Sequence, residues 1–284
     1  MLSPPNFPCP WASEWGEDDY GLWQTLVFSG VRQVFRWIEP GSFMMGSLKT
    51  EEEREWLKEL KGFETQHLVR LTKGFWLADS AVTQAYWLAV MGGDNRSSFQ
   101  DDLQNPVEQV SWDDTQLFIA KLNELLPGLH VRLPSEAQWE YACRAGTSTP
   151  FSFGNSITPN QVNYNGEYPY TGGQKGLNRR KTVPVKSLPA NTWGLYEMHG
   201  NVWEWCADAW QQDLGGKTAV DPVTTSDQGP RYMLRGGSWN DIGLDVRSAV
   251  RDHGAPDDRG FNLGFRLSLG HTELKPAGGG AGQD

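Results

Sequence analysis

The feature that most constrains this fold is a long stretch, residues 151–269, in which apolar residues show no helical spacing. Glycine, proline, asparagine and aromatic residues dominate it instead, and so much irregular chain is unusual in a compact domain. The whole chain contains 14 tryptophans and 32 glycines. Tryptophan buries a large area, and glycine permits left-handed backbone. We therefore expect ordered loops over a small antiparallel sheet, held together by large aromatic side chains.

Regular elements are predicted mainly in the first half of the chain. Alternation of apolar residues favours a strand at 31–38, and shorter strands are expected at 69–71 and 75–77. Capping residues and capping boxes predict three helices, which end near residue 91, before Pro127 and before Gly146. Their predicted starts are Thr83, Ser111 (paired with Asp114) and Ser135 (paired with Gln138). The second helix is expected to bury Leu117, Phe118, Leu122 and Leu125.

Composition excludes several classes of function. Lys and Arg number 25 against 35 Asp and Glu, which gives a net charge of −10, and an acidic surface repels nucleic-acid backbones. No apolar run approaches the roughly 20 residues that span a bilayer. The N-terminal residues show no signal-peptide pattern, so we expect a cytoplasmic protein without a membrane span. The three cysteines are too scattered for a disulfide framework or a four-cysteine zinc site.

The chain divides into three parts by composition. Residues 1–30 mix proline, tryptophan and acidic residues, and we expect an N-terminal arm packed on the domain. Residues 31–270 form the domain itself. Residues 271–284 are rich in glycine and are expected to be a flexible tail.

Six short motifs occur in a fixed order along the domain. They are GSFMMG at 41–46, PVEQVSWDD at 106–114, RLPSEAQWEYA at 132–142, GLYEMHGNVWEW at 194–205, RGGSW at 235–239 and LGFR at 263–266. This series resembles the formylglycine-generating-enzyme (sulfatase-modifying factor) family over about residues 35–270. The resemblance implies an α+β fold of the C-type-lectin-like kind, with little regular secondary structure.

The same resemblance argues against the family's chemistry. Oxidase members carry a pair of copper-binding cysteines just after the Arg-Gly-Gly-Ser motif, where this chain has none between Trp239 and Val246. Cys143 lies on a predicted helix and Cys206 follows another motif, so neither replaces the pair. Since soft thiolates select Cu(I), we expect no copper and no enzyme activity. The alternative is an oxidase or sulfoxide synthase with a different site, which copper-dependent oxygen uptake would reveal.

A narrower resemblance concerns residues 247–266, which are similar to the variable region of diversity-generating-retroelement proteins, with the whole variable region at about 234–269. Those proteins use the same fold as a scaffold, and template errors at adenines turn Asn codons into NNY codons. NNY codons cannot encode Lys, Glu, Gln, Met or Trp, and residues 240–262 contain none of these. The resemblance implies a non-catalytic protein that binds a macromolecular ligand, expected to be a protein. The alternative is an accessory domain whose surface is not diversified.

Within this region, three arginines are expected to fix the backbone through paired hydrogen bonds: Arg251, Arg259 and Arg266. Residues 263–265 would enter the core, and the residues between would point to solvent. The expected ligand-binding residues are Asn240, Asp241, Ile242, Gly243, Leu244, Asp245, Val250, Asp252, His253, Gly254, Ala255, Asp258, Gly260, Phe261 and Asn262.

The resemblance also implies a structural calcium ion. Its ligands would be the side chains of Glu197 and Glu204 and the carbonyl groups of Gly200 and Val202. Oxygen ligands on irregular backbone suit Ca²⁺. The alternative is a turn that hydrogen bonds alone hold in place.

Overall fold

The computed structural model describes residues 4, 6–51, 63–225 and 231–270. The tail predicted at 271–284 lies outside this part of the chain. The elements are β1 (Glu14–Asp18), β2 (Gly21–Phe28), β3 (Val31–Ile38), β4 (Gly41–Met45), β5 (His67–Leu71), β6 (Phe75–Ala78), α1 (Gln84–Met91), α2 (Trp112–Leu125), α3 (Glu136–Arg144), β7 (Trp203–Ala209), β8 (Ala219–Val220), β9 (Tyr232–Arg235), the 3-10 helix η2 (Gly243–Val246), β10 (Arg251–Gly254), β11 (Leu263–Gly264) and β12 (Ser268–Leu269).

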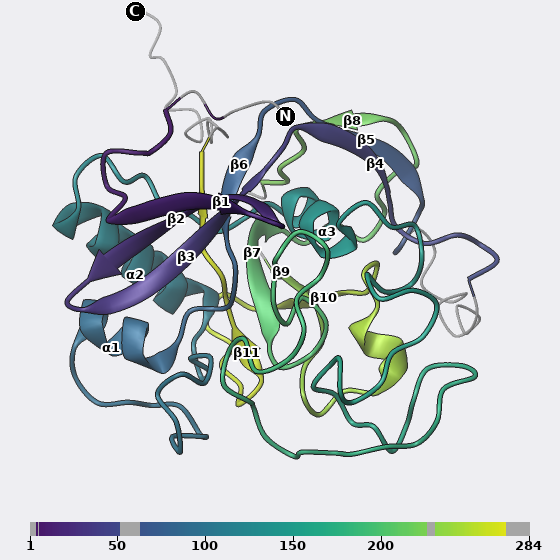
Figure 1. Ribbon diagram of the computed structural model, residues 1–284. Coiled ribbons are helices and arrows are strands. Elements are labelled where there is room, and N and C mark those ends of the chain that lie inside the picture. Colours follow the sequence, from purple (N-terminus) through teal and green to yellow (C-terminus); the bar gives the residue numbers. More distant parts are fainter. Residues whose placement is uncertain (1–3, 5, 52–62, 226–230, 271–284) are drawn as a thin grey trace, which may run out of the picture.

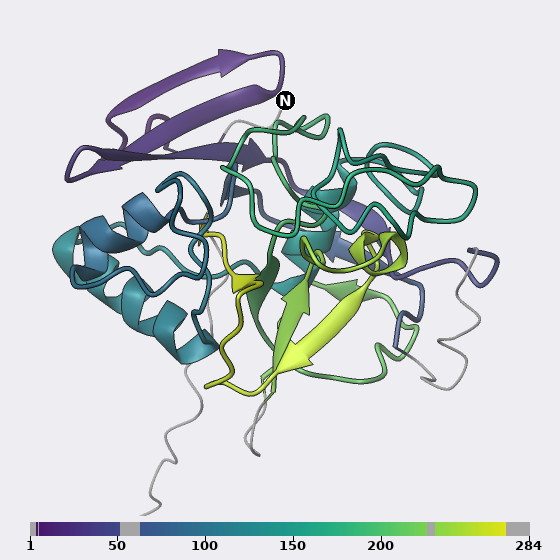
Figure 2. The same ribbon diagram turned by 90° about the horizontal axis from the view of Figure 1, so that it is seen from below.

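Three sheets organise these elements (Figure 1). The first has the strand order β1-β2-β3-β6-β12, the second β10-β9-β7-β11 and the third β4-β5-β8. The second sheet departs from the predicted antiparallel arrangement at one edge, where β11 runs parallel to β7. Figure 2 shows β9 and β10 side by side, with η2 close to one end of the pair.

The N-terminal residues contribute to the first sheet. Residues 14–28, within the range expected to be an arm, form β1 and β2, and β2 pairs antiparallel with β3. The strand predicted at 31–38 is confirmed as β3. The helices α1 and α2 lie beneath these strands (Figure 2).

The predicted helix starts are confirmed. The Thr83 side chain accepts a hydrogen bond from the backbone of Tyr86, and both capping boxes are formed, at Ser111 and at Ser135. In each box, two side-chain oxygens accept hydrogen bonds from two backbone N–H groups three residues apart, which is why the sequence predicts these starts well. Helix α1 ends at Gly92, whose φ of 68° suits glycine.

The predicted buried face of α2 is partly wrong. Phe118 and Leu122 are buried, but Leu117 is 61% and Leu125 44% exposed. The buried positions are Thr115, Phe118, Ile119 and Leu122, which follow the i, i+3, i+4, i+7 spacing of one helix face. That stripe begins at residue 115 and therefore leaves residue 117 on the solvent side.

Large aromatic side chains hold the core, as the sequence predicts. Trp139 and Trp205 are fully buried, and both indole N–H groups are satisfied. Trp205 donates to the carbonyl of Val110 at 3.0 Å, and Trp139 donates to the carboxylate of Glu204 at 2.7 Å. These bonds join β7 to distant parts of the chain. In the described part of the chain, no helix combines the length and the apolar character that crossing a membrane requires.

Candidate ligand-binding face

Residues 240–262, here called the display segment, connect β9 to the LGFR motif and include η2 and β10. The predicted arginine anchors of this region are confirmed. Arg251 binds both oxygens of Glu136 at 2.5 and 2.9 Å, in a pair that is almost fully buried. This bond ties β10 to the first turn of α3.

The other two predicted anchors have the same paired geometry. Arg259 binds Asp114 of α2 at 2.8 and 2.9 Å, in a pair that is partly exposed. Arg266 binds Glu204 of β7 at 2.6 and 2.7 Å, and this pair is buried. The display segment is therefore fixed to two helices, and the LGFR motif that follows it is fixed to the second sheet.

Two further anchors were not predicted from the sequence. Arg235 is fully buried and donates to Glu140 of α3 and to the carbonyl of Val250. Arg247 is also buried and donates to Glu64 at 3.0 Å. Burial alone would lower the pKa of Arg247, but Glu64 and Glu51 hold it above its ordinary value. The signal available in the sequence for Arg235 was its position immediately before Gly-Gly in one motif.

Most of the predicted ligand-binding residues reach solvent, and they do so between these anchors. Five are exposed and six are partly exposed. The exposed ones are Asn240, Ile242, Asp252, Asp258 and Phe261, and the partly exposed ones are Asp241, Asp245, His253, Ala255, Gly260 and Asn262.

The expected exposure is wrong for Leu244 and Val250, which are buried. Leu244 belongs to a core cluster with Phe151 and Val246. Val250 belongs to the main core cluster, just before β10. The 3-10 turn directs Leu244 inward, so neither residue contributes to the exposed surface.

The expected exposure is also wrong for Gly243 and Gly254. A Cβ atom at position 243 would lie 2.3 Å from the backbone nitrogen of Tyr170. A Cβ atom at position 254 would lie 2.6 Å from the ring of Trp205. Both positions require glycine for close packing, and this excludes them from a set of freely variable residues.

The two ends of the display segment meet. The Asn262 side chain donates to Asn240 at 3.2 Å and to the Ser238 hydroxyl at 3.3 Å, and Ser238 donates to Asn240 at 2.7 Å. Phe261 is 44% exposed and lies 5.5 Å from the ring of Trp239. The exposed ends therefore form one continuous polar and aromatic patch.

His253 lies on a second part of the face, on β10. Its ring is 4.2 Å from that of Trp210, and its Nδ1 accepts a hydrogen bond from Arg231 at 2.8 Å. Burial, followed by the nearby positive charge of Arg231, lowers the pKa of His253. The imidazole is therefore held neutral and oriented by its neighbours.

Carboxylates also gather along the face. Burial, together with the nearby charges of Asp241 and Asp252, raises the pKa of Asp245 to about 6. Crowded carboxylates of this kind favour a partner that brings positive charge.

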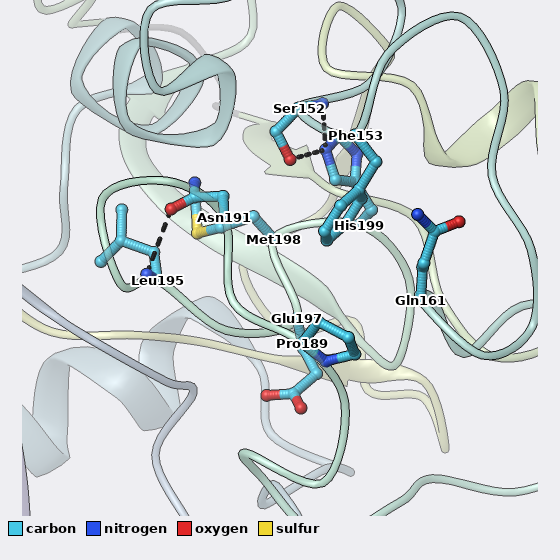
Figure 3. Close-up of a pocket in the computed structure, with 9 residues that line it drawn as sticks. All are labelled: Ser152, Phe153, Gln161, Pro189, Asn191, Leu195, Glu197, Met198 and His199. Atoms are coloured by element: carbon cyan, nitrogen blue, oxygen red, sulfur yellow. Dashed lines mark hydrogen bonds between the residues drawn. The ribbon is translucent and has the colours of Figure 1, made fainter. Parts of the chain in front are cut away.

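Cys143 is fully buried and lies beside His199. Cys143 Sγ lies 3.6 Å from His199 Nε2. The Ser152 hydroxyl lies 3.0 Å from the same nitrogen (Figure 3). Burial raises the pKa of the Cys143 thiol to about 12 and lowers that of His199 to about 4. The thiol therefore stays protonated at neutral pH, and the small pocket around His199 leaves no room for a water molecule.

The predicted calcium ligands fit an ion only in part. One carboxylate oxygen of Glu197 is buried without a hydrogen-bond partner among the described residues, and burial raises the pKa of Glu197 to about 7. That oxygen could bind a cation. Both oxygens of Glu204, however, already accept hydrogen bonds from Arg266, and one also accepts from Trp139. The calcium ion at Glu197, Gly200, Val202 and Glu204 stays a prediction.

Comparison with known proteins identifies relatives along most of the chain. Residues 31–269 match the model of the sulfatase-modifying factor enzyme 1-like domain. Formylglycine-generating enzyme from Bos taurus is 33% identical over 201 residues, which are 66% of this chain and 51% of that protein. Inactive C-alpha-formylglycine-generating enzyme 2 from Bos taurus is 32% identical over 247 residues, 84% of this chain and 68% of that protein. The chain thus spans about half the length of the first relative.

Two solved structures are similar over nearly their whole length. Treponema denticola variable protein 1 has a TM-score of 0.72 at 24% identity, covering 87% of this chain and 98% of that one. PvdO from Pseudomonas aeruginosa has a TM-score of 0.69 at 26% identity, covering 91% and 98%. The predicted α+β, C-type-lectin-like fold is confirmed.

Proposed function

Since the chain belongs to the sulfatase-modifying factor enzyme 1-like domain family, we propose that it is a non-catalytic member that binds a macromolecular ligand, a protein, through a diversified display segment. The segment's exposed side chains would contact the ligand. Other members of the same family supply the scaffold for different functions, so the site, and not the fold, must carry this proposal.

The observation that carries the proposal is the separation between anchors and exposed residues. Arg247, Arg251 and Arg266 bind buried carboxylates, whereas Ile242, Asp252 and other side chains of the display segment reach solvent. Substitution at exposed positions away from such contacts usually changes stability little. A loop fixed on a rigid scaffold is also the usual place for a binding surface.

The positions of the cysteines support the proposal that the chain is a non-catalytic member of the family. The stretch after Arg-Gly-Gly-Ser contains no cysteine, and Cys143 and Cys206 are fully buried. Burial raises the pKa of both thiols, which disfavours the thiolate form that binds copper.

Two matched libraries test the scaffold part of the proposal. In the first, NNY codons replace the five exposed residues Asn240, Ile242, Asp252, Asp258 and Phe261. In the second, NNY codons replace four buried residues of the same segment, Gly243, Leu244, Val250 and Gly254. We expect most members of the first library to resist proteolysis as the parent does, and most members of the second to lose this resistance. Equal losses in both would contradict a variable surface.

Selection from the first library tests binding. With a well-folded unrelated protein such as lysozyme as the probe, we expect binders whose sequences differ only at the exposed positions. Failure to recover any binder from a folded library would count against a protein-binding role. Copper-dependent, thiol-consuming oxygen uptake by the parent would instead establish the oxidase alternative.

The gene sequence distinguishes a diversified protein from an accessory domain. A diversified gene has a near-copy of its 3′ segment close by, with adenines where the two copies differ, beside a reverse-transcriptase gene. An isolated gene without the near-copy would favour the accessory domain.

A further inference from the structure

A cavity of about 260 Å³ lies outside the display segment. It is bordered by β4, by the C-terminal end of α3 and by the residues that follow α3. Its lining residues are Ser42, Phe43, Met44, Gln66, Tyr141, Arg144, Gly146, Thr147, Ser148 and Trp193. None of them belongs to residues 240–262, so this cavity is separate from the face of the proposed function.

Aromatic rings form one wall of the cavity. Tyr141 lies between the other two rings, 5.2 Å from Phe43 and 4.9 Å from Trp193, measured between ring centroids. All three side chains are partly exposed although they pack against a core cluster. A ring wall that stays partly open offers a flat apolar surface to a ligand.

Neutral polar groups complete the lining. The side chains of Ser42, Gln66 and Ser148 and the indole ring of Trp193, with its N–H group, also border the cavity. They provide both donors and acceptors around the aromatic wall. A ligand with several hydroxyl groups would satisfy them.

The lining carries no free charge. Arg144 is its one charged residue, and its guanidinium donates to Glu140 at 2.9 Å and to the carbonyl of Gly46 at 2.8 Å. It also donates to the carbonyl of Thr149 at 3.3 Å. With these bonds made, the cavity has no ion to pair with a charged ligand, and a neutral ligand fits it better.

We propose that this cavity binds a single neutral sugar ring. The apolar C–H face of a pyranose would pack on the rings of Tyr141 and Trp193, and its hydroxyls would bond with Gln66 and the serines. The volume lies just below the roughly 300 Å³ at which pockets for larger ligands begin, which admits one ring. This inference does not depend on the display segment, and its failure would leave the proposed function untouched.

Saturation-transfer NMR on the full chain tests the proposal with glucose, galactose, mannose and N-acetylglucosamine as probes at millimolar concentration, and with glucuronate as the charged comparison. We expect saturation transfer to at least one neutral sugar and weaker transfer to glucuronate. The variants Trp193→Ala and Gln66→Ala should each weaken the affinity about tenfold, because each removes one contact. The matched control is Trp15→Ala, which removes a 51% exposed indole ring on β1, outside the cavity, and should bind the sugar as the parent does.

Thermal unfolding shows first that each variant is folded, and Gln66→Ala keeps the test valid if Trp193→Ala is not. Three results would overturn the proposal. They are no transfer to any neutral sugar, equal sugar affinity in the parent and Gln66→Ala, and a loss of sugar affinity in the Trp15→Ala control as large as that in Trp193→Ala.

Discussion

At the scale of single residues, burial decides how much each ion pair of the display segment contributes to the free energy of unfolding. Arg251 and Glu136 are 1% and 6% exposed, whereas Arg259 and Asp114 are 44% and 19% exposed. Exposed ion pairs contribute little to stability because water screens the attraction between their charges. A buried pair that loses one partner leaves an uncompensated charge in the core.

Alanine replacements of the two arginines therefore differ in effect. We expect Arg251→Ala to lower the free energy of unfolding by about 3–5 kcal/mol, and Arg259→Ala by about 1 kcal/mol or less. Denaturant titration of both variants beside the parent measures the difference. Similar losses in the two would show that burial does not govern these anchors.

The carboxyl group of Glu197 predicts a pH dependence. Its pKa is raised to about 7 by burial, above its ordinary value of 4.5. The folded state therefore binds a proton more tightly than the unfolded state, so this group's stabilising contribution is complete below about pH 4.5 and is lost as pH rises to about 7. In the presence of a chelator, Glu197→Gln should remove this loss and be more stable than the parent at pH 8, by a few kcal/mol.

Unfolding free energies of parent and Glu197→Gln at pH 5 and pH 8 provide the measurement. The raised pKa of Glu197 would be contradicted if the difference in unfolding free energy between parent and variant were the same at pH 5 and pH 8. Added Ca²⁺ extends the same experiment to the predicted calcium ion, which should stabilise the parent at pH 8 and stabilise Glu197→Gln much less.

At the scale of elements, η2 separates two neighbouring side chains that look alike in the sequence. Ile242 is 36% exposed, whereas Leu244 is 8% exposed and packs in the cluster with Phe151. We expect Leu244→Ala to destabilise the protein by about 2–5 kcal/mol because it leaves a cavity. Ile242→Ala should cost about 0.5 kcal/mol. Thermal and denaturant unfolding of the two variants test this, and a larger loss in Ile242→Ala would reverse the assignment of inner and outer faces.

Other elements show what the sequence could and could not predict. Ser111 and Ser135 predicted helix starts because a capping box involves only residues three positions apart. Gly243 and Gly254 were expected in a variable surface because the groups that exclude side chains there, Tyr170 and a Trp205 ring, are distant in sequence. Local patterns therefore identified the scaffold, while the division of the display segment into buried and exposed positions required the tertiary structure.

At the scale of the whole molecule, the arginine–carboxylate pairs attach the display segment and the LGFR motif to distant helices and strands of the domain. Arg251 joins β10 to α3, and Arg266 joins the LGFR motif to β7, across 115 and 62 residues of sequence. Opening the segment locally would break a buried ion pair and leave an uncompensated charge, which makes local opening costly. We therefore expect its backbone amides to exchange with solvent mainly through global unfolding.

Hydrogen exchange followed by mass spectrometry tests this coupling. In the parent, peptides from residues 243–254 should exchange as slowly as those from β2 and β3. In Arg251→Ala, the peptides from 243–254 should accelerate more than those from β2 and β3, because this change uncouples one part of the chain. The exposed pair supplies the control, since Arg259→Ala should leave both sets nearly unchanged. Uniform acceleration of exchange in all peptides of Arg251→Ala would mean that Arg251 stabilises the domain as a whole and does not specifically hold the display segment. Core packing of Leu244 and Val250 would then be what fixes the backbone of the segment.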